Sequence, residues 1–316
     1  MAISIYRSTD PSAPTLANTA GALIAILDAC LVNGYGSKAA LGWTKEFSGT
    51  NLATYRAAVG NRLYLGIDDT GTNSARARAF SVATAAGVAV GSGTNPFPTD
   101  AQLSGGMYFN KAAGSNYPWV LVSNGRIFYL YVDYSNNGNA GVVSCFGDFV
   151  SYKTSDENGT VLIGSNGSTN SSAQFQNFKN ATNAVVPAHY LSQRYDGAAY
   201  SIACGKTPMS GLTAAAENMM SNTANYPLYP DPLLGSMFLT PFYVTEPDTT
   251  GTYGVIRGRL PGIWAACHRY APFTTGDVVS GDASSNANGK TFEVFRIYNS
   301  CVLIETSDTW DAINFR

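Results

Sequence analysis

The chain has 316 residues, 45% of them apolar and 13% charged, with a formal net charge of −2. This length and apolar content suffice to bury a core without disulfides or metals, and they argue against intrinsic disorder. The near-zero charge argues against a nucleic-acid binder that relies on a basic face. No apolar run approaches the roughly 18 residues that a membrane span needs, and the N-terminal residues do not resemble a signal peptide.

One helix is predicted near the N-terminus. The apolar residues that recur with the spacing of one helix face are Leu23, Ile26, Leu27, Cys30 and Leu31. We expect Asn18 or Thr19 to cap its start and Asn33-Gly34 to close its end in a left-handed conformation. The preceding segment, Tyr6–Thr15, contains two prolines and is expected to form an extended arm that reaches a neighbouring subunit.

Alternating side chains predict strands in the first half of the chain. Leu63–Ile67 and Ala75–Phe80 read as a hairpin around the turn Asp68–Gly71, with Arg76 and Arg78 on one face. We interpret the two acidic residues of this turn as turn formers, because a metal or acid/base site is the rarer use of such a pair.

The clearest hairpin signal lies in Trp119–Val132. Asn124-Gly125 stands between two β-branched and aromatic runs, and both residues tolerate the positive φ of a type I′ turn. Further strands are predicted at Val142–Tyr152 and Val161–Gly164.

The second half of the chain also consists of short predicted strands separated by turns, and it contains no internal repeat of fixed period. Its predicted strands are Ala198–Cys204, Met237–Val244, Thr252–Arg259, Phe292–Tyr298 and Val302–Thr306. Thr213–Met220 is a short helix candidate, and Ser280–Gly289 is expected to be a loop. The sequence therefore predicts a mainly β (α+β) fold with antiparallel β-sandwich or barrel-like sheets, one N-terminal helix and long loops. We expect a first domain at residues 1–165, a linker or surface loop at 166–185 and a second β-rich domain at 186–316.

Aromatic residues gather in the hairpin region. Alternating aromatics usually fill a core with one face, and the other face is a candidate interface because tyrosine and tryptophan are enriched there. A carbohydrate-binding platform would use the same residue types. The candidate interface aromatics are Tyr108, Tyr117, Trp119, Tyr129 and Tyr131.

The cysteines give no sign of a metal or disulfide framework. They are odd in number, widely spaced and without a CxxC pair, so we expect free thiols, most of them buried. They are Cys30, Cys145, Cys204, Cys267 and Cys301.

No catalytic, metal-binding or cofactor-binding set is recognisable. The two histidines are His189 and His268, and Cys267 adjoins the second, so in a strand the two side chains would point to opposite faces and could not pair. A glycosidase would need two carboxylates held about 5–10 Å apart. The residues that could supply them are Asp133, Asp148, Asp196, Glu246 and Asp248. Nothing marks two of these as special, so we expect no enzymatic activity.

Four stretches resemble structural proteins of tailed bacteriophages. They are Thr19–Gly36, Gly42–Asn51 with Tyr55-Arg56, Phe146–Lys153 and Arg259–Trp264, so they are spread over most of the chain. The part that reads Asp28-Ala-Cys-Leu-Val-Asn-Gly-Tyr-Gly36 is the most specific. The resemblance implies a virion component that is assembled in the host cytoplasm, and it provides no catalytic residue to carry over.

Three functions stay open on this basis. The first is a tail, neck or baseplate subunit that associates with itself as a homo-oligomer and with other virion proteins. The second is a receptor- or carbohydrate-binding protein at the tail tip or head surface, with a host surface glycan as partner. The third is a polysaccharide hydrolase. A receptor binder should show an open aromatic groove, a hydrolase paired carboxylates in a cleft, and a purely structural subunit neither.

Overall fold

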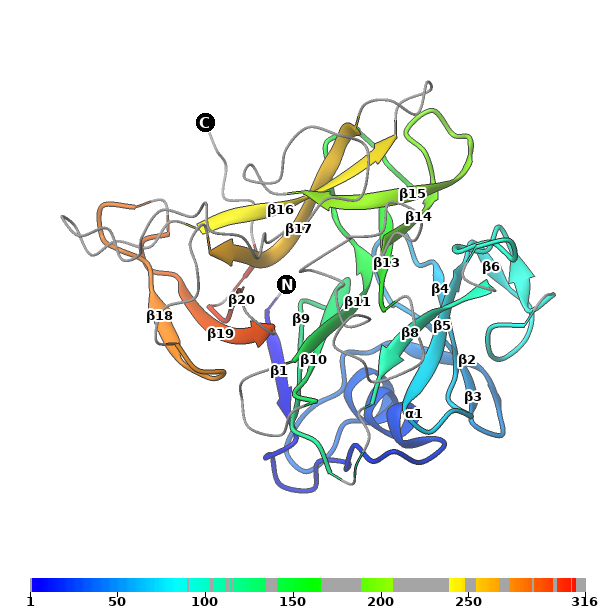
Figure 1. The fold of residues 1–316 in the computed structure, drawn as a ribbon, viewed down its shortest axis with the longest axis horizontal. Coiled ribbons are helices and arrows are strands. Elements are labelled where there is room, and N and C mark those ends of the chain that lie inside the picture. Colours follow the sequence, from blue (N-terminus) through cyan, green and yellow to red (C-terminus); the bar gives the residue numbers. More distant parts are fainter. Residues whose placement is uncertain are drawn as a thin grey trace.

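The structure is a computed structural model. It describes residues 2–89, 91–102, 105–111, 114, 116–134, 141–165, 189–206, 239–247, 254–266, 273–285, 287–297, 300–307 and 309–310. The described chain is mainly β, with antiparallel sheets and one short helix near the N-terminus, as the sequence predicts (Figure 1).

The largest sheet is antiparallel, has 13 strands and takes strands from both halves of the chain. Its strands in order are β1 (Ser4–Arg7), β9 (Trp119–Ser123), β10 (Ile127–Val132), β11 (Val142–Asp148), β13 (Thr160–Ile163), β14 (His189–Gln193), β15 (Ala199–Lys206), β16 (Leu239–Pro247), β17 (Gly254–Ala266), β20 (Ser300–Glu305), β19 (Thr291–Ile297) and β18 (Val278–Ser280). The short strand β12 (Val150–Ser151) pairs with β17 beside this path.

This sheet curls until its two arms face each other. The ring of Tyr129 on β10 lies 5.4 Å from that of Trp310, and the ring of Tyr131 lies 5.0 Å from that of Phe295 on β19. Arg7 on β1 also forms a two-pronged ion pair with Glu293 on β19, at 2.7 and 2.5 Å. These contacts join strands from opposite parts of the sheet, so its two arms pack face to face, consistent with the β-sandwich that the sequence predicts.

A second sheet lies beside the β9–β11 part of the first (Figure 1). Its strands in order are β2 (Thr44–Gly49), β3 (Leu52–Arg56), β4 (Tyr64–Asp68), β5 (Ser74–Phe80) and β8 (Met107–Asn110). A small ribbon, β6 (Val82–Ala83) with β7 (Gly93–Thr94), follows β5. The helix α1 (Ala22–Leu27) continues directly into the π-helical turn η1 (Asp28–Asn33).

Strands β9 to β11 are buried on both faces. Phe128 and Leu130 belong to a cluster shared with the helix and the second sheet, whereas Tyr129 and Tyr131 belong to a cluster shared with the other arm of the first sheet. Successive side chains of a strand point to opposite faces, so one hairpin serves two cores. This placement explains why its sequence is almost continuously apolar.

The helix is capped differently from the prediction. The residue before its first turn is Gly21, with φ 83°, and no side chain of the helix start caps it. The distant carboxylate of Asp69 accepts hydrogen bonds from the amides of Leu23 and Ile24 at 2.8 and 3.1 Å. At the other end Gly34 has a positive φ of 75° but an extended ψ of 171°, so the predicted left-handed closure is wrong.

The β9–β10 hairpin exists, but its turn is not of type I′. Ser123 pairs with Phe128, which leaves a connection longer than two residues. Gly125 has φ 84°, whereas Asn124 is not among the residues with positive φ. The side-chain Oδ1 of Asn124 instead accepts hydrogen bonds from the amides of Arg126 and Ile127, at 3.0 and 3.2 Å. A local side-chain acceptor therefore replaces the left-handed backbone at this residue.

Two predicted extended segments are also divided differently. The predicted strand Val142–Tyr152 ends at Asp148 and restarts as β12, which pairs with β17 and not with β10. In the predicted arm, Tyr6 and Arg7 pair with β9 of the same chain. The arm therefore belongs to the chain's own sheet over these residues.

The predicted strands of the second half correspond to β15, β16, β17, β19 and β20, and β14 was not predicted. All of the predicted linker at 166–185 and all of the predicted helix Thr213–Met220 lie outside the described residues. The division into domains 1–165 and 186–316 stays a prediction. Strands β14 to β20 continue the sheet that β9 to β13 begin.

Candidate functional site

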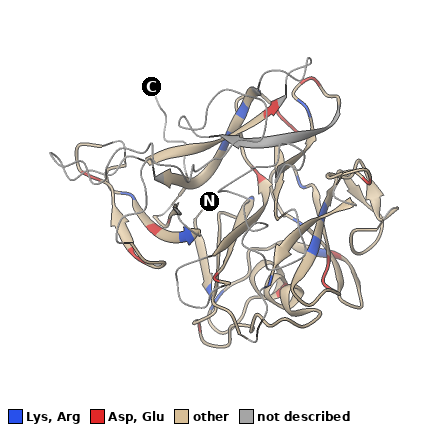
Figure 2. Cartoon of the chain, viewed as in Figure 1, with Lys and Arg blue, Asp and Glu red and all other residues tan. Residues whose placement is uncertain are grey.

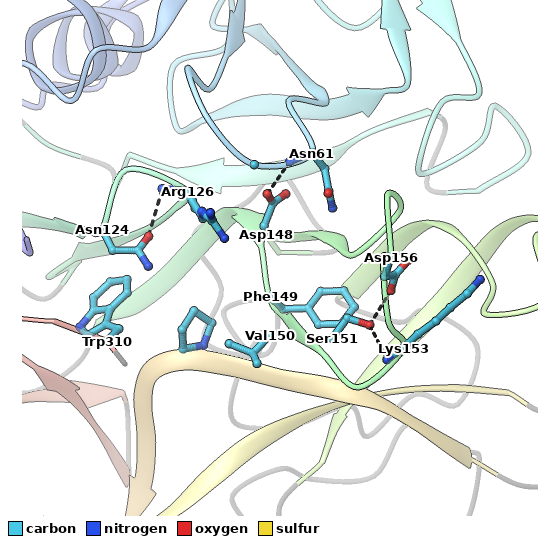
Figure 3. Close-up of a pocket in the computed structure, with 12 residues that line it drawn as sticks. Asn61, Asn124, Arg126, Asp148, Phe149, Val150, Ser151, Lys153, Asp156 and Trp310 are labelled. Atoms are coloured by element: carbon cyan, nitrogen blue, oxygen red, sulfur yellow. Dashed lines mark hydrogen bonds between the residues drawn. The ribbon is translucent and has the colours of Figure 1, made fainter. Parts of the chain in front are cut away.

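A cleft of about 500 Å³ opens where turns from both sheets meet (Figure 3). The β3–β4 connection brings Asn61, and the β9–β10 turn brings Asn124 and Arg126. The rest of the lining comes from the segment from Asp148 to Asp156, which contains β12, from Pro261 of β17 and from Trp310. The cleft thus collects residues from five separate parts of the sequence.

The β9–β10 turn supplies the donors of the cleft. Arg126 is exposed, and its guanidinium forms no hydrogen bond with the described residues, but its charge acts to lower the pKa of the neighbouring Asp148. Asn124 uses its Oδ1 atom to hold the turn, so its Nδ2 group remains for a ligand. The turn therefore has a fixed backbone and carries two side-chain donors, one on the exposed Arg126 and one on the half-buried Asn124.

Asp148 stands at the end of β11, beside Arg126, because its amide donates to the carbonyl of Arg126 at 3.1 Å. Its Oδ2 atom accepts a hydrogen bond from the amide of Asn61 at 2.7 Å, and its Oδ1 atom accepts one from the Thr160 hydroxyl at 2.6 Å. Burial raises the pKa of this carboxyl above its ordinary value, and the nearby charge of Asp156 adds to the rise. Gly60 makes the approach possible, because a Cβ there would stand 2.0 Å from Oδ2.

Asp156, at the other end of the segment that begins at Asp148, is held in an internal hydrogen-bond network. Its two oxygens receive hydrogen bonds from Arg257 at 2.8 and 2.7 Å, and Ser151 donates a third at 2.6 Å. Burial alone would raise the pKa of Asp156, but these bonds and the Arg257 charge hold it below its ordinary value. Arg257 also binds Glu246 at 2.9 Å, and the three side chains form a buried Asp–Arg–Glu triad.

Pro261 and Trp310 close the apolar side of the cleft. Pro261 lies where the register between β16 and β17 is interrupted, and its carbonyl accepts a hydrogen bond from Tyr129 at 2.8 Å. The indole of Trp310 packs against Gly262, where an added Cβ would stand 2.3 Å from the ring. A proline is tolerated within this strand because it coincides with an irregularity in the pairing.

The aromatic candidates lie mostly inside the chain. Trp119, Tyr129 and Tyr131 are between 0% and 2% exposed, so they fill the chain's own cores and offer no outer surface. Tyr108 and Tyr117 are half-buried. A subunit contact through these two stays a prediction.

The carboxylates named from the sequence are dispersed. Asp148 lines the cleft, Glu246 is in the buried triad, Asp133 is buried elsewhere and Asp196 is half-exposed beside Arg194 at 3.5 Å. Asp248 and His268 lie outside the described residues, and of His189 only the backbone in β14 is described.

Of the two acidic residues predicted to be turn formers, Asp68 holds the turn, whereas Asp69 has a different structural role. Asp69 is completely buried, caps α1 and forms a 2.5 Å ion pair with Lys111. Asp68 accepts hydrogen bonds from Thr70 in the turn. Among the described residues no group of histidine, cysteine and acidic side chains is placed to hold a metal ion.

Comparison with known proteins identifies no family. No protein-family model matches the chain, and no curated protein matches it. In the described part of the chain, no helix has both the length and the apolar character to cross a membrane.

The sequence predicts Asp148 as a candidate carboxylate, but it does not predict the cleft. The turn at Asn124 was predicted as a backbone feature, and neither Arg126 nor Asn61 carries a local signal of binding. Their meeting depends on how the end of β11 lies against the β3–β4 connection, which the sequence pattern does not encode.

Proposed function

We propose that the chain is a structural component of a tailed-bacteriophage virion, such as a tail, neck or baseplate subunit, and that it acts through protein–protein assembly. The proposal starts from the four stretches that resemble phage structural proteins. The comparisons with known proteins neither support nor oppose it, and its further support comes from what these stretches do in the fold.

Residues of the resembling stretches join separate parts of the fold. Asp28 accepts hydrogen bonds from the Tyr55 hydroxyl and from Lys45, each at 2.8 Å. The indole of Trp43 donates to the carbonyl of Gly125 at 2.9 Å, which ties the start of the second sheet to the β9–β10 turn. These residues of the first two stretches serve as scaffold, as expected for a structural protein, and this is the observation that carries the proposal. The stretches Phe146–Lys153 and Arg259–Trp264 also line the cleft.

The surface also suits association. Charged residues are few and scattered along the described chain (Figure 2). Tyr152 is 56% exposed and Ile256 is 54% exposed, and they lie on neighbouring backbone segments, since the amide of Tyr152 donates to the carbonyl of Arg257. Exposed apolar side chains in one region of the surface favour an interface with another protein.

The test is whether the chain is part of a particle. Virions purified from the phage that encodes the chain should contain it in many copies, and electron microscopy should locate it in the tail, neck or baseplate. The purified chain should form a symmetric homo-oligomer in light-scattering measurements. A chain that is made during infection but is absent from washed particles would overturn the proposal.

An interface variant makes the test sharper. Ile256→Lys places a charge in the exposed Tyr152–Ile256 pair and should reduce assembly without altering the thermal melt. Val82→Lys is the matched control, because Val82 is 52% exposed and lies in the separate two-stranded ribbon of β6 and β7. Equal assembly of both variants would show that this pair is not the interface.

The second candidate is a receptor- or carbohydrate-binding role, and the observation that favours it is the polar cleft. Hydrolysis has less support, because Asp156 is held by Arg257 and its side chain is only 3% exposed.

A further inference from the structure

We propose that the cleft between the β9–β10 turn and the β11–β12 segment binds a neutral oligosaccharide, with Arg126 and the amide of Asn124 as its principal donors. The inference does not rest on the virion role, since a cleft of this chemistry would bind such a ligand in any setting. It also differs from the aromatic platform expected from the sequence, because most of that platform is buried.

The lining has the mixed chemistry that a sugar requires. A sugar presents several hydroxyls that both donate and accept hydrogen bonds, and its ring carbons form apolar faces. The cleft offers donors at Asn124 and Arg126 and a carboxylate acceptor at Asp148, beside the apolar surface of Val150 and Pro261. An apolar small molecule would leave these polar groups desolvated and unpaired, which disfavours it.

The charges of the cleft favour a neutral ligand. Arg126 and Lys153 are balanced by Asp148 and Asp156. Asp156 is further neutralised by Arg257, but that arginine is itself shared with Glu246. A phosphate or a polyanion would gain attraction from two cations and repulsion from two carboxylates, whereas a neutral polyol can use both kinds of group for hydrogen bonds.

The backbone of the turn that carries the donors is held in place before any ligand arrives. The backbone of the β9–β10 turn is fixed by Asn124 and by Ser123, whose hydroxyl accepts from the amide of Gly125 at 2.9 Å. Trp43 reaches the same turn from the other sheet and donates to the carbonyl of Gly125. A rigid turn lowers the entropy lost on binding, so weak individual hydrogen bonds can add to a measurable affinity.

The size of the cleft agrees with this ligand. About 500 Å³ lies within the range of roughly 300–1,000 Å³ found for small-molecule sites. The cleft is open, so a longer chain of sugars could extend beyond it (Figure 3).

Titration calorimetry with a neutral trisaccharide, maltotriose, and a printed array of neutral and acidic oligosaccharides tests the inference on the full chain. We expect saturable binding to neutral members of the array. Arg126→Ala should weaken that binding by about tenfold, the effect of losing a charged hydrogen-bond donor. Arg126 is exposed, so the variant should melt at the wild-type temperature.

Two further variants separate binding from structure. Asn124→Asp keeps the acceptor that holds the turn but removes the open amide donor, so it should fold normally and bind more weakly. Arg62→Gln is the matched control, because Arg62 is also exposed but does not line the cleft, and its affinity should stay within about twofold of wild type.

Four other outcomes would count against the inference. Failure to bind any neutral oligosaccharide would overturn it, as would binding only to acidic sugars or to inorganic phosphate. Equal losses in Arg126→Ala and Arg62→Gln would place the site elsewhere. Cleavage of maltotriose would replace a binding site with a hydrolase. A chain that binds sugar but is absent from virions would leave this inference standing and overturn only the structural role.

Discussion

The buried ion pair between Asp69 and Lys111 fixes the N-terminal helix to the second sheet. Both side chains are fully buried, and the Lys111 ammonium donates to Asp69 Oδ1 and to the carbonyls of Thr19 and Gly71, at 2.5 to 2.7 Å. Burial raises the pKa of Asp69 above its ordinary value, and the Lys111 charge opposes that rise. The pair therefore depends on both partners being present.

Replacing Lys111 by methionine should destabilise the fold by about 3–5 kcal/mol, because it leaves a buried carboxylate without its cation. Urea unfolding of the purified variant measures this loss. Lys45→Met is the control, because Lys45 and Asp28 are 25% and 23% exposed, and an exposed pair contributes about 1 kcal/mol or less. Equal losses in the two variants would contradict the assignment of a special role to the buried pair.

The Asp–Arg–Glu triad predicts a pH dependence. The pKa of folded Asp156 lies below its ordinary value of 3.8, so its charged form stabilises the fold above that pH, and this stabilisation is lost as the pH falls through the folded pKa. Asp156→Asn should therefore cost about 3 kcal/mol at pH 7, the low end for a buried pair, since Glu246 still neutralises Arg257. Unfolding curves at pH 7 and pH 3 should show the gap to wild type narrowing, and a gap that widens would refute this assignment.

The substitution Asp148→Asn should have the opposite effect on stability from Asp156→Asn. The pKa of folded Asp148 is raised, so its charged form is unfavourable at neutral pH, and wild type gains stability as the pH falls below the folded pKa. The asparagine can still accept from the Asn61 amide and donate to the Thr160 hydroxyl. We expect the variant to melt at or above the wild-type temperature at pH 7, with the difference disappearing near pH 3. A large loss at pH 7 would contradict this account of the Asp148 site.

At the level of elements, the β9–β10 turn requires glycine at position 125. Its φ of 84° is one that a β-branched residue resists, so Gly125→Val should destabilise the fold by about 1–3 kcal/mol. Gly49→Val is the control, because Gly49 has no positive φ and a Cβ there meets Leu52 at an ordinary 3.5 Å. Thermal melts that shift equally for both would count against a conformational requirement at Gly125.

The sequence predicts elements better than it predicts their ends. Alternation marks β5, and runs of β-branched and aromatic residues mark β10 and β13, since both patterns depend only on which side chains face a core. The cap of α1 could not be predicted, because its acceptor is Asp69, 46 positions beyond Leu23. The break after β11 was also missed. Gly147 has φ 142°, and a Cβ there would stand 2.2 Å from the carbonyl of Arg126, a constraint visible only in the folded chain.

The candidate site was less predictable than the fold. Asp148 was a reasonable acidic candidate, but its raised pKa comes from burial and from Asp156, which the sequence does not place beside it. The aromatics were expected to be divided between a core and an outer face. Trp119, Tyr129 and Tyr131 are buried because the hairpin separates two cores, and that depends on the second sheet packing on its far side.

For the whole molecule, we expect five free thiols. Cys30, Cys145 and Cys301 are buried and unpaired, and burial raises the pKa of Cys301 to about 12. For Cys204 and Cys267, the prediction of free thiols depends only on their spacing in the sequence. A thiol reagent in denaturant without reductant should count five per chain, whereas in native buffer the three buried thiols should react slowly. A count of three or one would show that disulfides are present.

The chain as a whole is expected to act by association and not by catalysis. Its resemblance to structural proteins, its scarce charge and the internal use of its buried acids favour association over catalysis. Cys267 and His268 are the only adjacent cysteine and histidine in the sequence, so they are the fairest test of hidden nucleophilic chemistry. The double variant Cys267→Ser, His268→Gln should assemble and support infection like wild type, as measured by light scattering and by plaque counts on complemented phage. Particles that assemble normally with the variant but fail to infect would favour a catalytic role, as would release of reducing sugar from host polysaccharide by the wild-type chain, since that reaction would use carboxylates instead.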